Sequence, residues 1–289
     1  MPFIVSVALL AVVTALACAL PGTFIVLRKQ SMLVEAISHA VLPGIVVGAL
    51  ISGSTHSPIM VLTAAIMGLV VVFGAEKLRN SGLIVGDAHQ GLIFPVLFAI
   101  GVILLSTVLH SVHLCQDTVL TGDLNLMALS PEHIIFGTID IGPRVMWRLL
   151  GVFLLTGAYI VLVYPKLKLA TFDPLLARSM GIPVKTISAG LMLLLSLTVV
   201  VAFDAAGAIL VVALMVVPPA TALLFARTLP GMMCASLVIA VVSALLGFSI
   251  ALVGDLATSS MMAVVDAAVF LIVFCIVKVR EHVIRQRAI

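Results

Sequence analysis

Charged residues are scarce in this sequence. Asp, Glu, Lys and Arg make up only 9% of its 289 residues, whereas soluble domains contain about 25%. Trp occurs once and Tyr twice. Because so few polar residues cannot cover a water-facing surface, the chain as a whole is not a soluble enzyme, a nucleic-acid binder, a coiled coil or a disordered protein. The net charge of +3 is also too small to indicate binding to a polyanion such as nucleic acid.

Several sequence motifs that indicate metal binding, nucleotide binding or catalysis are also missing. The four cysteines lie in or beside apolar stretches with no paired spacing, which excludes a disulfide or zinc-knuckle pattern. No G-x-x-x-x-G-K-[ST] motif is present, so the chain is not itself an ATPase and we expect no enzyme activity on it. The H-E-x-x-H and G-x-S-x-G patterns of intramembrane hydrolases are absent as well.

Long apolar runs are abundant instead, since 63% of the residues are hydrophobic. They predict an all-α polytopic membrane protein with about nine transmembrane helices. No Lys or Arg precedes the first run, and it exceeds the h-region of a signal peptide, so we interpret it as a retained span. The predicted spans are 3–27, 32–51, 58–75, 91–109, 149–164, 187–203, 207–226, 232–253 and 261–277.

Lys and Arg predict the orientation of these spans. With the N-terminus outside, only Arg144 and Arg148 of the 15 basic residues fall outside, which leaves 13 inside. We therefore expect an outer N-terminus and a cytoplasmic C-terminus. An eight-span arrangement would require one boundary to be redrawn, in the first two spans or around 109–148.

The longest segment between spans, 110–148, is predicted to form short helices on the outer side, some of them re-entrant. No loop is long enough for a separate domain, so residues 1–289 are expected to form a single transmembrane domain. Any energy source or soluble receptor must then lie on other chains.

Glu35 and His39 are the most informative polar residues. They are four positions apart, so a helix places them on one face. His39 lies ten residues beyond Lys29, or about 15 Å along a helix, which is near the middle of a membrane. A carboxylate and an imidazole suit Mn(II), Fe(II) or Zn(II). The alternative is that Glu35 pairs with Arg28 or Lys29 and that His39 is a satisfied core histidine.

Two features follow in the same stretch. Pro43 has no N–H to bond the carbonyl of His39, and the freed carbonyl helps to open a polar pocket. Gly44 and Gly48 form a small-xxx-small pair, which suits close helix packing.

A short helix is predicted at 173–181, within the inner loop 164–186. Asp173 can cap its start, Pro174 fits its first position, and Gly181 ends it. Leu176 and Met180 share one face, whereas Arg178 points elsewhere. An ordinary interfacial helix is the alternative interpretation.

Five ordered segments resemble those of the permease subunits of manganese, zinc and iron importers of the ATP-binding-cassette class. Residues 35–44, E-A-I-S-H-A-V-L-P-G, are similar to the family signature G-D-A-I-S-H-A-V-L-P-G. The segments 91–101, 121–131, 172–181 and 207–224 are similar to the family's G-I-x-F-S-x-x-F-A-L-G, F-G-[DN]-[IL]-L-A-V-S-P, F-D-x-x-x-A-[RK]-x-[ML]-G and P-A-A-T-A regions.

The resemblance implies a metal gate formed by Glu35 and His39, with manganese as the first candidate and zinc or iron as alternatives. The sequence departs from the family where Gly-Asp becomes Val34-Glu35, and where the later D-L-P-S-G becomes D-L-A-T-S-S at 255–260. The longer carboxylate arm keeps metal contact feasible but leaves its geometry open. The transported ion would be cargo, so no permanently bound cofactor is expected.

The resemblance also implies partners. It predicts a second permease copy or a related permease, cytoplasmic ATP-binding subunits that meet the helix at 173–181, and a metal-binding protein outside. The location would be a bacterial cytoplasmic membrane, in contact with lipid and not with nucleic acid. A motor-independent secondary metal transporter is the rival, but the inverted repeats it would need are not evident.

Two further sets of residues carry weaker signals. His110, His113 and Cys115 have the residue types of a metal site, but an outer solvated loop makes an incidental cluster the favoured interpretation. Asp266 falls inside the last span, where a carboxylate is costly, and no role can be assigned to it.

Overall fold

The computed structural model describes residues 3–52, 58–82, 88–108, 122, 124–129, 133–136 and 139–287. The predicted weak cluster His110–Cys115 lies outside these residues. The elements in chain order are α1 (Phe3–Leu27), α2 (Met32–Ser52), α3 (Pro58–Asn80), α4 (Ala88–Val108), α6 (Leu124–Ala128), β1 (His133–Phe136), β2 (Ile139–Pro143), α7 (Arg144–Phe172), α8 (Pro174–Ser179), α9 (Val184–Leu223), α10 (Leu229–Gly254) and α11 (Thr258–Arg287).

Within the described residues, seven helices have the length and apolar composition needed to cross a membrane, namely α1, α2, α3, α7, α9, α10 and α11. A shorter apolar stretch, Gly91–Thr107, lies in α4. The chain is therefore an all-α polytopic membrane protein, apart from one short β-hairpin.

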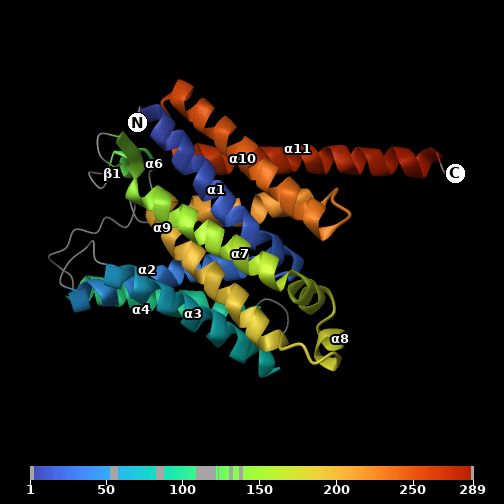
Figure 1. Ribbon diagram of the computed structural model, residues 1–289, viewed down its shortest axis with the longest axis horizontal. Helices are drawn as coiled ribbons and strands as arrows, with labels where there is room; N and C mark the ends of the chain where they lie inside the picture. Colours follow the sequence, from blue (N-terminus) through green and yellow to red (C-terminus); the bar gives the residue numbers. More distant parts are fainter. Residues whose placement is uncertain are drawn as a thin grey trace.

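α9 is broken near its middle at Gly207. This residue has φ 77° and ψ 167°, a conformation that glycine adopts easily because it has no Cβ. The two halves of α9 run in different directions on either side of it (Figure 1). The break falls at the predicted boundary between the spans 187–203 and 207–226.

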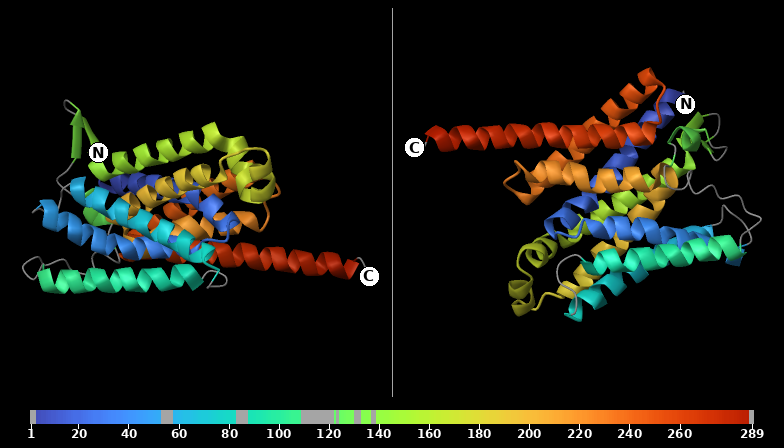
Figure 2. Two further views of the ribbon diagram at one scale, coloured as in Figure 1. Left: turned by 90° about the horizontal axis from the view of Figure 1, so that it is seen from below. Right: turned by 180° about the vertical axis from the view of Figure 1, so that it is seen from behind.

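The helices form two outer groups with a central set between them. α2, α3 and α4 lie together along one side, while α10 and α11 lie on the other (Figures 1 and 2). α1, α7 and α9 run between them, and α1 packs against α7, α9 and α10. The N-terminus and the β-hairpin lie at one end of the molecule, whereas α8 and the end of α11 lie towards the other (Figure 1).

The segment before α7 differs from its prediction. One short helix, α6, forms as expected, but β1 and β2 form an antiparallel hairpin where only helices were predicted. The hairpin satisfies backbone groups between two strands that are too short to span a membrane. α7 is also longer than the predicted span 149–164, because it starts directly after Pro143 and continues through Pro165 to Phe172.

α2 and α3 approach each other closely at two glycines. A Cβ added at Gly44 would lie 2.5 Å from the Cα of Ala64, and one at Gly48 would collide with Thr63. The hydroxyl of Thr63 also donates to the carbonyl of Gly44 over 2.8 Å. The small-xxx-small pair therefore lies in the α2–α3 contact.

Gly44→Ala is expected to lower the thermal stability of the protein, because the added methyl group must push α3 away. Gly151→Ala is the matched control, since nothing lies within 4 Å of a Cβ at that position. The measurement is the unfolding midpoint of purified protein in detergent. Equal midpoints for the two variants would contradict the close contact.

Candidate metal site on α2 and its surroundings

Glu35 and His39 lie on one face of α2, and both are partly buried. Glu35 is in the first turn of the helix, where a carboxylate interacts favourably with the N-terminal end of the helix dipole. Residues on either side of them, such as Val34, Ile37 and Ala40, are fully buried in the bundle. The site is thus built on a rigid, packed helix and not on a loop.

Two phenylalanines of α4 cover His39. The Phe94 ring is stacked on the imidazole with the ring centres 5.3 Å apart, and the Phe98 ring meets it edge-on at 5.3 Å. Gly101, one turn further, lets α4 approach Pro43, since a Cβ there would lie 2.8 Å from the proline Cδ. These contacts hold the imidazole in one orientation.

Sequence reasoning missed this role for Phe94 and Phe98. The signal was present, because Phe94, Phe98 and Gly101 are spaced at i, i+4 and i+7 and therefore form one stripe on a helix. However, α4 is apolar on every side, so the stripe could not be assigned to α2 before the helices were placed.

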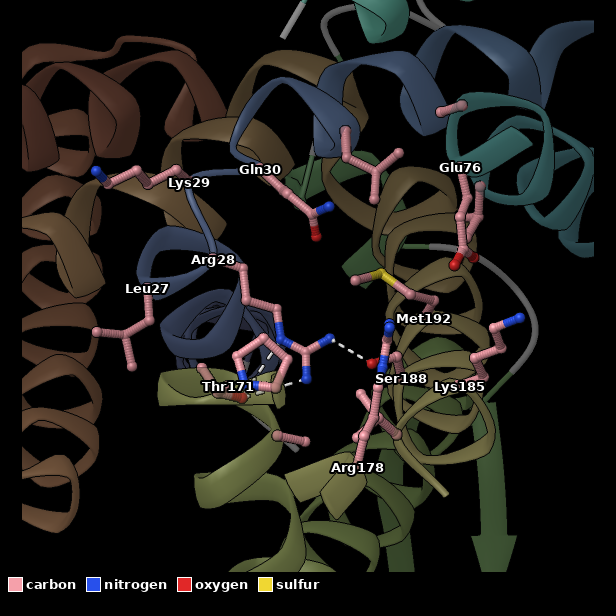
Figure 3. A pocket seen from close by; sticks show the side chains of 16 residues that line it. Leu27, Arg28, Lys29, Gln30, Glu76, Thr171, Arg178, Lys185, Ser188 and Met192 are labelled. Carbon is pink, nitrogen blue, oxygen red and sulfur yellow. Dashed lines mark hydrogen bonds between the residues drawn. The ribbon is translucent and has the colours of Figure 1, made fainter. Parts of the chain in front are cut away.

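The Nδ1 atom of His39 is buried, and no described residue bonds to it. Leaving such a nitrogen unpaired costs about 1–3 kcal/mol, which a bound ligand can recover. Arg28 donates hydrogen bonds to the hydroxyl groups of Thr171 and Ser188 (Figure 3). The arrangement therefore does not match a fully satisfied core histidine.

Glu35 and His39 are a pair of potential metal ligands. Among the described residues, no group of three or more His, Cys, Asp or Glu side chains comes together. Structural metal sites usually have four protein ligands, so this pair would be a partial coordination shell. Glu35 and His39 can provide one oxygen and one nitrogen to a metal ion.

The predicted inner helix corresponds to α8, which is shorter than the expected range of 173–181. The carboxylate of Asp173 accepts a hydrogen bond from the backbone N–H of Leu176 over 2.9 Å, and Pro174 follows it. Met180 follows the last helical residue, and Gly181 has φ 74°, which ends the helix.

One side of α8 packs on the protein and the other is exposed. Ala177 is fully buried against Ala170 and Val184. Leu176 and Met180 are 48% and 65% exposed, and Leu175 is 77% exposed. Leu175, Leu176 and Met180 together form the exposed apolar surface of α8 and of the residue that follows it.

Asp266 is the remaining carboxylate inside the bundle. It is 1% exposed, and neither of its oxygens has a hydrogen-bond partner among the described residues. Asp255 ends α10 in a left-handed conformation, and Asp204 is exposed. Neither of these two lies with Glu35 and His39.

Comparison with known proteins assigns this chain to a family. The family model described as "ABC 3 transport family" matches residues 1–277. The chain belongs to this transport family. A manganese transport system membrane protein, MntD of Bacillus subtilis, is 41% identical over 252 residues, covering 87% of this chain and 84% of that protein.

A second relative of this family member is named for a different metal, and a solved structure is also similar to the chain. A zinc transport system membrane protein, TroD of Treponema pallidum, is 42% identical over 212 residues, covering 73% of this chain and 57% of that protein. The solved structure of PsaBC from Streptococcus pneumoniae in complex with Fab has a TM-score of 0.76 at 29% identity, covering 95% of this chain and 91% of that one. This family member is accordingly a membrane permease of an ATP-binding-cassette metal transporter.

Phe94→Leu is expected to lower metal uptake several-fold, because leucine fills the space but loses the stacking contact that orients His39. Phe73→Leu is the control, since Phe73 is 52% exposed on α3. Uptake is measured in cells that produce equal amounts of each variant. Identical uptake rates for both variants would show that Phe94 does not contribute to the site.

Proposed function

We propose that this chain is the permease of a manganese importer, with Zn(II) or Fe(II) as the alternative cargo. The observation that carries the proposal is the pairing of Glu35 with His39 on α2, where the Nδ1 of His39 is buried and unbonded by any described residue. A carboxylate oxygen and an imidazole nitrogen suit all three ions. The relative named for manganese covers more of this chain than the one named for zinc, which supports manganese first.

We propose nine spans, with the N-terminus outside and the C-terminus in the cytoplasm. The number is reached when α4 is counted with the seven long helices and α9 is counted as two spans that meet at Gly207. An odd number places the two termini on opposite sides. The excess of Lys and Arg on the side of α8 supports the cytoplasmic assignment of that side.

Residues 1–289 would act as one domain within a larger assembly. A second permease copy or a related permease would complete the pathway, and a metal-binding protein would deliver the ion from outside. α4 covers one side of His39 within this chain, and both Glu35 and His39 are partly exposed. Ligands from both copies would complete the coordination shell.

ATP hydrolysis would take place on a separate cytoplasmic subunit that contacts α8. The exposed apolar surface of α8, Leu175–Leu176–Met180, supports this proposal, because such side chains gain free energy when a partner covers them. Asp173, Pro174 and Gly181 give the helix its defined ends, and Arg178 would pair with acidic groups of the ATPase.

Glu35→Ala and His39→Ala are each expected to abolish metal uptake while the protein still folds, because both residues contribute ligands more than packing. Glu35→Asp should retain uptake, since it restores the carboxylate of the family signature, and it should shift the preference among metals. Uptake of Mn(II), Zn(II) and Fe(II) is compared in cells that also contain the ATPase. Normal uptake by both alanine variants would refute the site.

The double variant Leu176→Asp, Met180→Asp is expected to insert in the membrane but to lose ATPase association and transport. Two charges would then lie in an apolar contact, where their desolvation is unfavourable. Phe225→Asp is the control, because Phe225 is a 51% exposed apolar residue beyond α9. Co-purification with the ATPase and metal uptake are measured together. A double variant that retains both would show that α8 is only an interfacial helix.

A further inference from the structure

Asp266 is a carboxylate buried inside the helix bundle. It lies in α11, eight residues after Thr258 and hence about 12 Å along the membrane-spanning part of that helix. Its exposed fraction is 1%, and neither carboxylate oxygen has a hydrogen-bond partner among the described residues. An ionised carboxylate in such a place is very unfavourable unless a positive charge or several hydrogen-bond donors compensate it.

The contact between α10 and α11 brings Ser243 next to Asp266. The two helices run side by side in roughly opposite directions (Figure 1), and a Cβ added at Gly247 would lie 2.6 Å from the Cα of Met262. Ser243 precedes Gly247 by one turn. Asp266 follows Met262 by one turn, so Ser243 and Asp266 lie at the same level and face each other. The Ser243 hydroxyl is also buried, and it has no hydrogen-bond partner among the described residues.

The described helices around α11 direct no cationic side chain at Asp266. α1, α6 and α10 contain no Asp, Glu, Lys, Arg or His, and α9 contains Lys185 and Asp204, both of which are exposed. Within α11 the first basic residue is Lys278, about 18 Å further along the helix. Cys18 of α1 is fully buried and close enough to interact electrostatically with the carboxylate, but a thiol supplies no positive charge.

We propose that Asp266 and Ser243 form a site for one small monovalent cation, which neutralises the carboxylate inside the contact between α10 and α11. A single carboxylate balances a single positive charge, and carboxylate and hydroxyl oxygens are the ligands that hard cations prefer. Na+ meets this description. A proton meets it as well, because it converts the carboxylate into a carboxylic acid that can donate to the oxygen of Ser243.

Occupancy of this site would stabilise the packing of α11 on α10, since a ligand that binds the folded protein stabilises it by mass action. α2, α3 and α4 lie on the other side of the molecule (Figure 2), so the site is separate from Glu35 and His39. The proposal therefore depends neither on which metal is transported nor on the number of spans.

The test measures the unfolding midpoint of the purified full-length chain in detergent. In one series Na+ replaces N-methylglucamine at fixed pH and ionic strength, and in a second series without Na+ the pH is lowered from about 8 to about 5. The midpoint should rise by several degrees in at least one series, because the folded protein binds the cation more tightly than the unfolded chain does. Asp266→Asn, which is neutral and similar in shape, should remove that rise.

Ser243→Ala retains the carboxylate and should reduce the rise, because it removes an oxygen that contacts the cation. This variant keeps the test available if Asp266→Asn does not fold. Asp255→Asn is the matched control, since Asp255 is an exposed carboxylate at the end of α10. Its responses should equal those of the unchanged protein.

The two series distinguish the source of the cation. A rise with Na+ alone identifies Na+, a rise on acidification alone identifies a proton, and a rise in both indicates that the two cations compete for one site. Responses of Asp266→Asn and Ser243→Ala that equal those of Asp255→Asn in both series would overturn the proposal. Stabilisation by Mn(II) alone, lost in Asp266→Asn, would also overturn it, because Asp266 would then bind a divalent metal.

Discussion

The hydrocarbon layer of a membrane offers no partner to a backbone N–H or carbonyl group, and this constraint explains most of the structure. Long helices satisfy these groups internally, and buried hydroxyl side chains follow the same rule. Thr14 and Ser38 donate to the carbonyls of Leu10 and Val34 in their own helices. Among the described residues, few buried polar side chains lack a hydrogen-bond partner, and those that do are informative for that reason.

His39 on α2 is one such group. The buried Nδ1 of His39 has no described partner, although two aromatic rings fix the imidazole. Arg28, just before α2, donates hydrogen bonds to the hydroxyl groups of Thr171 and Ser188 and thereby joins α1 to α7 and α9. At His39 the fold positions a polar group whose Nδ1 no described residue bonds, which is the arrangement expected of a binding site.

The candidate metal site and α8 are joined through packed helices. α8 packs through Ala177 on the end of α7 and the start of α9, and α9 in turn contacts α2. A movement of α8 can therefore reach α2 through rigid elements, because packed helices transmit displacement better than they deform. The break at Gly207 gives α9 a place to change direction without a loop.

Much of this protein was predictable from its sequence. Apolar runs of membrane-spanning length indicate the helices, and the i, i+4 spacing places Glu35 and His39 on one face. Asp173, Pro174 and Gly181 predicted a helix whose core, Pro174–Ser179, the structure contains. These features are local, because they depend on the hydrogen bonds and side-chain directions of one helix.

Other features required the tertiary structure. The β-hairpin formed by β1 and β2, the aromatic cover of His39 by α4, and the meeting of Arg28 with Thr171 and Ser188 all join residues whose pairing no local pattern specifies. In a chain whose helices are apolar on every side, periodicity cannot show which face meets which neighbour. The sequence by itself determined the membrane-spanning helices and the polar residues they carry. Close packing at positions such as Gly44 and Gly101 decided which of those residues come together.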